Sequence, residues 1–203
     1  MNKDQLKRIQ LFLSDKGFNI GDIDGVLGVK TRQALTEYQR SASLKADGVP
    51  GPMTWNSMFG EKLPKPKAMD IVKKAIQLFD HKEYILGYED DFNDPNPPAS
   101  DCSEAVEITC HQCGVMPVMP DGSRWQYKHC RSYGTIIPVE QAIKTLGALL
   151  FVIDYDRGHF HVAISQGNGK TIECRGRRYG CGQFDADRPG WTHGALIPGV
   201  DYK

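Results

Sequence analysis

The stretch PNPPASDCSEAVEITC, residues 95–110, decides how the larger part of this chain folds. After its prolines, Asp101 stands three residues before Glu104, the spacing of a helix capping box with Asp in place of Ser or Thr. If Asp101 is the N-cap, Cys102 is the first residue of a helix that ends before Gly114. The positive end of the helix dipole favours a thiolate there, and a helix start usually faces a loop or a cleft. We therefore expect Cys102 to be an exposed, reactive thiol.

A cysteine nucleophile needs a base, and the base needs an orienting group. The stretch GHFHVAISQGNGKTIEC, residues 158–174, has two strand-like runs around a Gly-Asn-Gly turn. A three-residue loop pairs Ser165 with Thr171 and places Glu173 on the same face as His161. A loop of two or four residues places Glu173 on the opposite face. The candidate base and its partner therefore depend on this register.

With that register, Cys102 attacks a carbonyl, His161 moves the proton and Glu173 holds the imidazole. His159 is the alternative base, although a strand-end or exposed position suits it better. The backbone N–H of Cys102 and the hydroxyl of Tyr84 are the expected donors to the oxyanion.

The N-terminal part contains an internal echo: DGVLGVKT (24–31) recurs as DGVPGPMT (47–54). Asp-Gly marks a turn, and Thr is a good helix N-cap. Apolar residues recur at helical spacing at Leu6, Ile9, Leu13, Ala34, Leu35 and Tyr38. We expect a small three-helix bundle over residues 1–60, a proline- and lysine-rich linker over 61–67, and a second domain over 68–203.

The bulk composition is that of a soluble globular chain, with 203 residues, 40% hydrophobic and 25% charged residues and a formal net charge of zero. This charge gives no reason to expect nucleic acid as a partner. No apolar run is long enough for a signal peptide or a membrane span, so we expect cytoplasmic synthesis and no membrane insertion. Without an export signal, reduced thiols are the expected state of Cys102, Cys110, Cys113, Cys130, Cys174 and Cys181.

A zinc site is the alternative for three of these cysteines. Cys110, Cys113 and Cys130, with a neighbouring histidine, have the ligand types and number that zinc prefers. Cys110 and Cys113, however, are expected within the helix that begins at Cys102, whereas zinc knuckles usually use a turn. We therefore favour small core thiols or an adventitious disulfide, and expect no cofactor.

Residues 4–59 resemble the small peptidoglycan-binding domain found at the ends of many cell-wall hydrolases. The resemblance is carried by IQLFL, GFNIGDIDGVLGVKTRQALTEYQR and LKADGVPGPMTW. From about residue 68 to 198, the chain resembles the NlpC-type cell-wall peptidases, a branch of the papain-like cysteine peptidases. That resemblance is carried, in the family's order, by YILGY, DCSEAV, PDGSRWQYKHC, VEQAIKTLGALLFVI, HVAIS and GNGKTIEC.

The second resemblance implies an α+β fold in which helices pack on a small antiparallel sheet, with the cysteine at a helix start and the histidine on a strand. It implies the peptide stem of peptidoglycan as substrate, often cut between D-glutamate and the diamino acid. It also implies a substrate site lined by Tyr84, Asp101, Ser103 and Trp125. The chain departs from the family pattern at Glu104, where glycine is usual, at Gly87-Tyr88, where paired glycines are usual, and at Glu173 in the third catalytic position.

A wall-binding module joined to a wall peptidase without a signal peptide resembles a phage endolysin, which reaches the wall once the membrane is permeabilised. We expect such an enzyme to be a monomer and to act as an endopeptidase on bacterial peptidoglycan. Two alternatives stay open. One is an N-acetylmuramoyl-L-alanine amidase with the same thiol chemistry, and the other is a non-catalytic wall-binding or tail structural protein.

Overall fold

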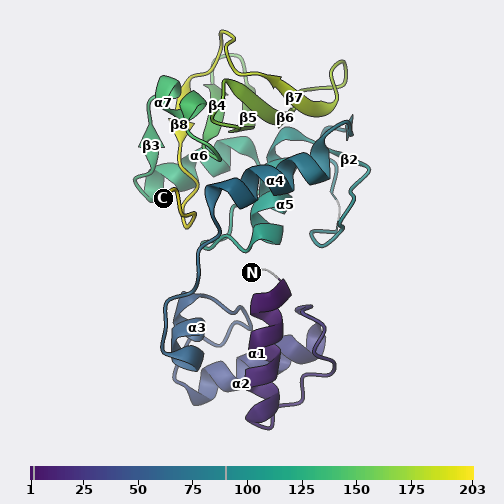
Figure 1. Cartoon of the computed structure of the whole chain (residues 1–203), viewed down its shortest axis with the longest axis vertical. Coiled ribbons are helices and arrows are strands. Elements are labelled where there is room, and N and C mark those ends of the chain that lie inside the picture. The colour runs from purple at the N-terminus through teal and green to yellow at the C-terminus, as the bar shows by residue number, and fades with distance from the viewer. Residues whose placement is uncertain (2, 90) are drawn as a thin grey trace. The chain divides into compact units, whose positions relative to one another are not determined.

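The computed structural model describes all residues of the chain except Asn2 and Asp90. The chain divides into two compact units, Met1–Pro64 and Lys65–Lys203. Helices form the first unit, and helices packed on an antiparallel sheet form the second (Figure 1). The predicted α+β class is therefore confirmed. Among the described residues, no helix has the length and apolar character needed to cross a bilayer.

The N-terminal unit is a bundle of α1 (Lys3–Asp15), α2 (Val29–Ser41) and α3 (Pro52–Phe59). Its core gathers around Trp55, which is almost fully buried, and the aromatic rings of Phe12 and Phe59 meet edge to face at a centroid distance of 5.5 Å. The predicted three-helix bundle is confirmed, and the apolar residues noted at helical spacing are all buried: Leu6, Ile9, Leu13, Ala34, Leu35 and Tyr38.

A buried glutamine fastens the first copy of the repeated turn. The Gln10 amide nitrogen donates to Asp24 Oδ1 at 2.9 Å and to the Val26 carbonyl at 3.1 Å. It lies 3.3 Å from Thr31 Oγ1, and the Gln10 carbonyl oxygen accepts from the Gly25 N–H at 2.7 Å. The side chain of Gln10 thus ties helix α1 to the loop that precedes α2.

A second glutamine repeats this arrangement on the second copy. The Gln39 amide nitrogen donates to Asp47 Oδ1 at 3.2 Å, to the Val49 carbonyl at 2.9 Å and to Thr54 Oγ1 at 3.1 Å. Its carbonyl oxygen accepts from the Gly48 N–H at 2.8 Å. The repeated sequence therefore forms a repeated structure, in which a buried glutamine amide hydrogen-bonds to the backbone groups of a tight turn.

The larger unit is built on a six-stranded antiparallel sheet with the strand order β3-β8-β4-β5-β6-β7. The strands are β3 (Ile136–Ile137), β4 (Leu149–Asp154), β5 (His159–Ser165), β6 (Lys170–Cys174), β7 (Cys181–Asp185) and β8 (His193–Ala195). A separate short parallel pair joins β1 (Glu83–Tyr84) to β2 (Ala99–Ser100). In the described part of the unit, the sheet is accompanied by α4 (Ala68–Phe79), α5 (Cys102–Cys113), α6 (Ser123–Ser132) and α7 (Val139–Lys144).

Helices cover both faces of the sheet. Helices α4 and α5 pack together against the face that carries Phe151 and Val162, where the main core lies (Figure 1). Leu150 belongs instead to a smaller cluster with Ala142 of α7. Because Leu150 and Phe151 are neighbours in one strand, their side chains point to opposite faces, so α7 covers the second face.

The β5–β6 hairpin has the register that a three-residue loop predicts. Ser165 pairs with Thr171, and Ile164 pairs with Ile172. Gly167 in the turn has a φ of +73°, and a Cβ there would lie 2.8 Å from the Leu146 backbone nitrogen, so glycine is required at this position. The predicted register is confirmed.

The end of the proline–lysine segment is attached to the larger unit. The Ala68 N–H donates to the Asp201 carbonyl at 2.9 Å, and the Asp201 N–H donates to the Pro66 carbonyl at 2.9 Å. The segment therefore enters the larger unit alongside its C-terminal residues.

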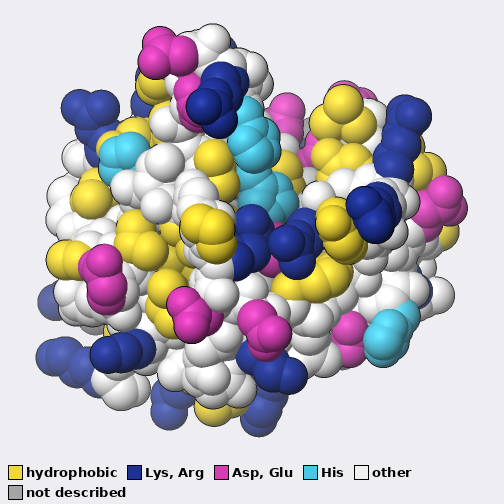
Figure 2. Space-filling view, turned by 90° about the horizontal axis from the view of Figure 1, so that it is seen from above, with side chains coloured by type: hydrophobic (Ala, Val, Ile, Leu, Met, Phe, Trp, Pro, Cys, Tyr) yellow, Lys and Arg dark blue, Asp and Glu magenta, His cyan; other side chains and the backbone are white. Residues whose placement is uncertain are grey.

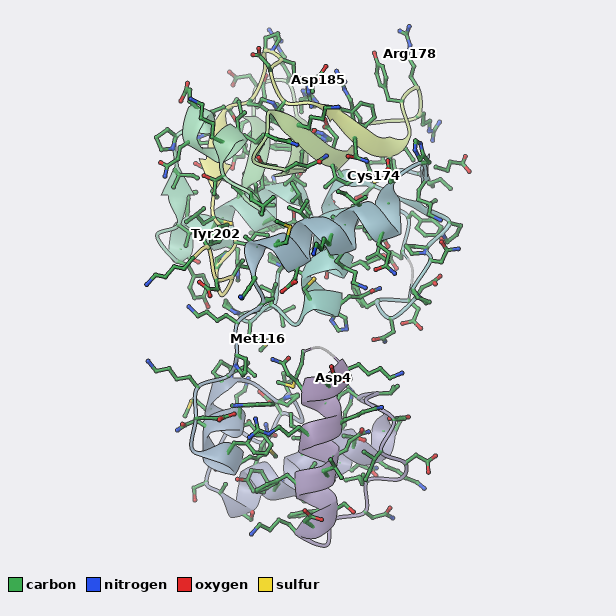
Figure 3. All side chains as sticks on the ribbon, viewed as in Figure 1. Asp4, Met116, Cys174, Arg178, Asp185 and Tyr202 are labelled. Carbon is green, nitrogen blue, oxygen red and sulfur yellow. A yellow bond between two sulfur atoms is a disulfide. The ribbon has the colours of Figure 1, made fainter. Side chains whose placement is uncertain are left out.

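Cys174 and Cys181 form a disulfide, so the expectation of reduced thiols is wrong for this pair. The register of β6 and β7 sets the two residues directly opposite each other, with their Cα atoms 3.8 Å apart. Directly paired residues project to the same side of a sheet, which brings the two sulfurs together. Figure 3 labels Cys174 at the end of β6. The pairing depends on β7, a strand that the sequence patterns did not predict.

Candidate active site

The start of α5 is capped as predicted. The Asp101 carboxylate accepts hydrogen bonds from the backbone N–H groups of Ser103 at 2.9 Å and Glu104 at 3.0 Å, and Cys102 is the first residue of the helix. Gly114 ends the helix in the left-handed conformation with a φ of 75°. The cap fixes the direction of the first turn and so the position of the thiol.

Cys102 is less exposed than expected. It retains 8% of its surface and belongs to the main core together with Val106 and Val162. The start of α5 lies against the sheet instead of standing at an open rim, which is why the prediction of an exposed thiol is wrong in degree. The thiol is free, unlike the pair on β6 and β7.

His161, from the middle of β5, meets Glu173 from β6. The His161 Nε2–H donates to Glu173 Oε2 at 2.5 Å, and the two side chains are 11% and 0% exposed. This arrangement leaves Nδ1 of the imidazole for the Cys102 side. His159, the alternative base, is exposed at the first position of β5.

The surroundings of His161 favour its charged form. Burial lowers the pKa of His161, but hydrogen bonds to Cys102 and Glu173, and the negative charges of both, outweigh it and raise the pKa to about 9. At neutral pH the imidazole is therefore a cation that lies between a sulfur and a carboxylate.

Glu173 has two further donors besides His161. The Arg188 Nη2 donates to Glu173 Oε2 at 2.9 Å, and the Thr171 hydroxyl donates to Glu173 Oε1 at 2.9 Å. Burial raises the pKa of Glu173, but the hydrogen bond and charge of His161 and the charge of Arg188 lower it more, so the net shift is downward. Arg188 was missed from the sequence because it lies in an irregular segment between β7 and β8, where spacing gives no signal.

Tyr84 lies at the same site, on the short strand β1. Burial raises the pKa of its phenol to about 12, and negative charge at Cys102 and Asp101 adds to the rise. Its hydroxyl therefore keeps its proton at neutral pH and is available as a hydrogen-bond donor.

Two other predicted residues have different surroundings. The Ser103 hydroxyl is buried and donates to Asp101 Oδ1 at 2.9 Å, so it takes part in the helix cap. Trp125 is 51% exposed on α6, where the ammonium group of Lys128 lies 4.2 Å from its ring centroid. A substrate-binding role for Ser103 and Trp125 stays a prediction.

An acidic pocket of about 280 Å³ opens beside the start of α5. Its walls are formed by Gly87, Tyr88, Glu89, Phe92, Asp101, Glu104, Glu107 and Asp121. Burial raises the pKa of Glu107 to about 7, and the negative charges of Asp121 and Glu104 add to this rise. The pocket shares Asp101 with the helix cap and therefore lies beside the first turns of α5, on the face that carries Glu104 and Glu107. Its walls come from separate segments of the chain.

The remaining free cysteines lie in the core. Burial raises the pKa of Cys113 to about 11 and that of Cys130 to about 12, and it raises the pKa of Cys110 well above its ordinary value. Within the described part of the chain, no group of three or more metal-binding side chains lies close enough to hold an ion.

One face of the larger unit brings basic side chains next to histidines. Figure 2 shows dark-blue Lys and Arg side chains beside cyan histidines at the centre of the face that it displays. Two arginines are tied to the site by their charges: Arg188 through Glu173, and Arg177 through Tyr84.

The N-terminal unit matches a known sequence family. Residues 2–58 match the family described as "Putative peptidoglycan binding domain". A curated relative, the N-acetylmuramoyl-L-alanine amidase CwlM of Mycobacterium tuberculosis, is 43% identical over 56 residues, which are 28% of this chain and 14% of the amidase.

Solved structures match the arrangement of the larger unit. The NlpC/p60 domain of the peptidoglycan hydrolase SagA superposes with a TM-score of 0.51 at 24% identity, covering 64% of this chain and 99% of that domain. The larger unit has the NlpC/p60 fold. The peptidoglycan hydrolase RipB of Mycobacterium tuberculosis gives a TM-score of 0.51 at 20% identity, covering 98% of this chain and 85% of RipB. NlpC1 of Trichomonas vaginalis gives 0.52 at 18% identity, covering 68% of this chain and 46% of that protein.

These matches confirm the modular organisation that the sequence predicted, with a peptidoglycan-binding family match followed by an NlpC/p60 fold. The chain spans less than half of the length of NlpC1 and about a seventh of the amidase. The phage origin stays a prediction.

Proposed function

We propose that this chain is a peptidoglycan hydrolase that cleaves an amide bond in the peptide stem through a cysteine nucleophile. One observation carries the proposal: a free thiol at the start of α5 is hydrogen-bonded to a buried histidine whose other ring nitrogen donates to a buried glutamate. A thiol, a base and an orienting carboxylate in this order are the parts that acyl transfer needs.

The reaction divides into two steps. The Cys102 thiolate adds to the scissile carbonyl carbon, and His161 then gives its Nδ1 proton to the leaving amine as the C–N bond breaks. The acyl group is left on sulfur as a thioester. His161 next takes a proton from water, which attacks the thioester and returns Cys102. Glu173 holds the imidazole in place throughout, and the Cys102 N–H and the Tyr84 hydroxyl serve as donors to the oxyanion.

The acidic pocket favours an endopeptidase over an amidase. Its carboxylates suit a positively charged group of the substrate, and Asp101, one of its walls, is the N-cap of the helix that bears the nucleophile. A diamino acid can carry a free amine, whereas the muramoyl side of the sugar–peptide amide has none. We therefore propose the bond between D-glutamate and the diamino acid, with the amidase as the second candidate.

The N-terminal unit supplies the second part of the proposal. Its family match over residues 2–58 supports attachment to peptidoglycan, which would keep the catalytic unit close to its substrate. Lysis of a host cell and passage from the cytoplasm to the wall stay predictions.

Digestion of purified sacculi tests the proposal. The protein should release peptides with a new amino group on the diamino acid and a new carboxyl group on D-glutamate, identified by mass spectrometry. An amidase would instead expose the amino group of L-alanine. Cys102→Ala should bind sacculi as before and release nothing. Products that persist in Cys102→Ala, or new reducing sugar ends, would contradict cysteine peptidase action.

A further inference from the structure

Arg188 stands at the outer end of a line of alternating charges. Its guanidinium donates to Glu173, Glu173 accepts from His161, and His161 is hydrogen-bonded to Cys102. The Arg188 side chain is 21% exposed and the Glu173 side chain is fully buried, so solvent screens their interaction little.

The Trp191 ring lies against both cationic side chains, His161 and Arg188. Its ring lies nearly parallel to the His161 imidazole, at an interplanar angle of 20° and a centroid distance of 5.9 Å. The Arg188 guanidinium lies 4.2 Å from the centroid of the Trp191 ring. The Trp191 indole N–H donates to the Ala186 carbonyl at 3.0 Å, which fixes the ring.

The segment that carries Arg188 and Trp191 is attached to the sheet at both ends. At one end, the Ala186 N–H donates to the Gly169 carbonyl at 2.8 Å. At the other, the Thr192 N–H donates to the Phe151 carbonyl at 2.8 Å. The guanidinium is therefore held in one place relative to Glu173.

We propose that Arg188 is a positioning residue that holds Glu173 toward His161 and sets how strongly the imidazole keeps its proton. Arg188 and His161 share Glu173 Oε2, so the guanidinium offsets part of the negative charge that His161 experiences. Without it, Glu173 stabilises the imidazolium more strongly, and the imidazolium becomes a weaker acid toward the leaving amine. The inference rests on the proposed function for its effect on hydrolysis, but its effect on His161 is independent of any substrate.

The first measurement follows the titration of His161 by NMR. Arg188→Met should raise the pH midpoint of His161 by about one unit, because a nearby positive charge is lost. Arg188→Gln keeps a donor but removes the charge, and it should shift the midpoint in the same direction. Arg188→Lys keeps the charge and should stay near the parent protein.

A matched control comes from the loop between β6 and β7. Arg178 is exposed there, and its side chain points outward from the tip of the loop (Figure 3). Arg178→Met removes the same charge from the chain and should leave the midpoint unchanged. Thermal unfolding of each variant shows whether it is folded, and Arg188→Gln and Arg188→Lys serve if Arg188→Met is not.

The second measurement is the pH profile of sacculus hydrolysis. Arg188→Met should lower the rate at neutral pH about tenfold and move the alkaline limb of the profile upward by the same amount as the NMR midpoint. An unchanged His161 midpoint in Arg188→Met and Arg188→Gln would overturn the proposal. An equal shift in Arg188→Lys would also overturn it, because packing and not charge would then be the cause. If the parent protein hydrolyses nothing, the proposed function fails, while the NMR result still decides the role of Arg188.

Discussion

In the N-terminal unit, each buried glutamine binds the loop that it faces, whereas in the larger unit, buried polar side chains from separate strands bind one another around a thiol. Gln10 and Gln39 each hydrogen-bond to backbone groups and to one aspartate, and these partners all belong to the N-terminal unit. His161 and Glu173 also form a buried pair, but their line ends at a free cysteine. Burial of polar groups alone therefore does not indicate chemistry. Chemistry is indicated by a reactive group at the end of the hydrogen-bond network, which here is the free thiol.

Removal of the base of the larger unit should have the largest effect on hydrolysis. His161→Gln should lower sacculus hydrolysis by about 1,000-fold or more, because the leaving amine then loses its proton donor. His159→Gln is the matched control on the same strand and should hydrolyse at the parent rate. Release of soluble peptides from labelled sacculi measures both. Equal losses in the two variants would mean that the buried pair is structural, like the glutamines.

The next prediction concerns the stability of the N-terminal unit. Gln39→Ala should destabilise that unit by about 2–4 kcal/mol, since the Gly48 N–H and the Val49 carbonyl lose a buried partner. The stability of the larger unit should not change. Hydrogen exchange resolved by peptide measures the two units separately. Gln33→Ala, at an exposed position of the same helix, should change stability by less than about 0.5 kcal/mol.

The two networks should also respond differently to pH. The pKa of His161 is about 9 in the folded unit, above its ordinary value near 6.5. Its contribution to stability is therefore complete below about pH 6.5 and is lost as the pH rises through 9. We expect the larger unit to lose on the order of 2 kcal/mol over this window, measured by denaturant unfolding.

His161→Gln removes the titrating group and should flatten this dependence. A parent protein whose larger unit keeps constant stability between pH 6.5 and 9 would show that the imidazolium is not held as the structure indicates.

The smallest effect concerns the acidic pocket. Burial and neighbouring carboxylates raise the pKa of Glu107 to about 7, above its ordinary value near 4.5, so folding favours its protonated form. This group makes the fold less stable as the pH rises from about 4.5 through 7. Glu107→Gln should stabilise the larger unit by about 1 kcal/mol at pH 8, a value reduced for the solvent exposure of the carboxyl group.

Thermal unfolding at pH 8 and pH 4 measures this effect, which should be absent at the lower pH. The same gain at both pH values would mean that the charge of Glu107 is not its cause.

Local patterns predicted the parts of the site that depend on neighbours in the chain. Asp101 and Gly114 marked the two ends of α5, and the Gly-Asn-Gly turn fixed the register that places Glu173 with His161. The degree of burial of Cys102 could not be predicted, because it depends on how closely α5 packs against the sheet.

Other features needed the tertiary structure. The disulfide requires the pairing of β6 with β7, and Arg188 reaches Glu173 from an irregular segment 15 residues further along the chain. The role of Gln10 and Gln39 was hidden because their distances to the repeated aspartate differ, at 14 and 8 residues. The two copies of the repeat make the same kind of hydrogen bond from glutamine to aspartate, although the number of residues between the two partners differs.

The central claim is that the Cys102 sulfur carries the acyl group during hydrolysis. Its most direct test is to mix the protein with a soluble disaccharide-peptide fragment of peptidoglycan, quench in acid within the first turnover and map the adduct by mass spectrometry. We expect a thioester at Cys102 whose acyl group ends in D-glutamate and which hydroxylamine removes. Turnover of the fragment without an adduct at Cys102, and at the same rate in Cys102→Ala, would contradict it.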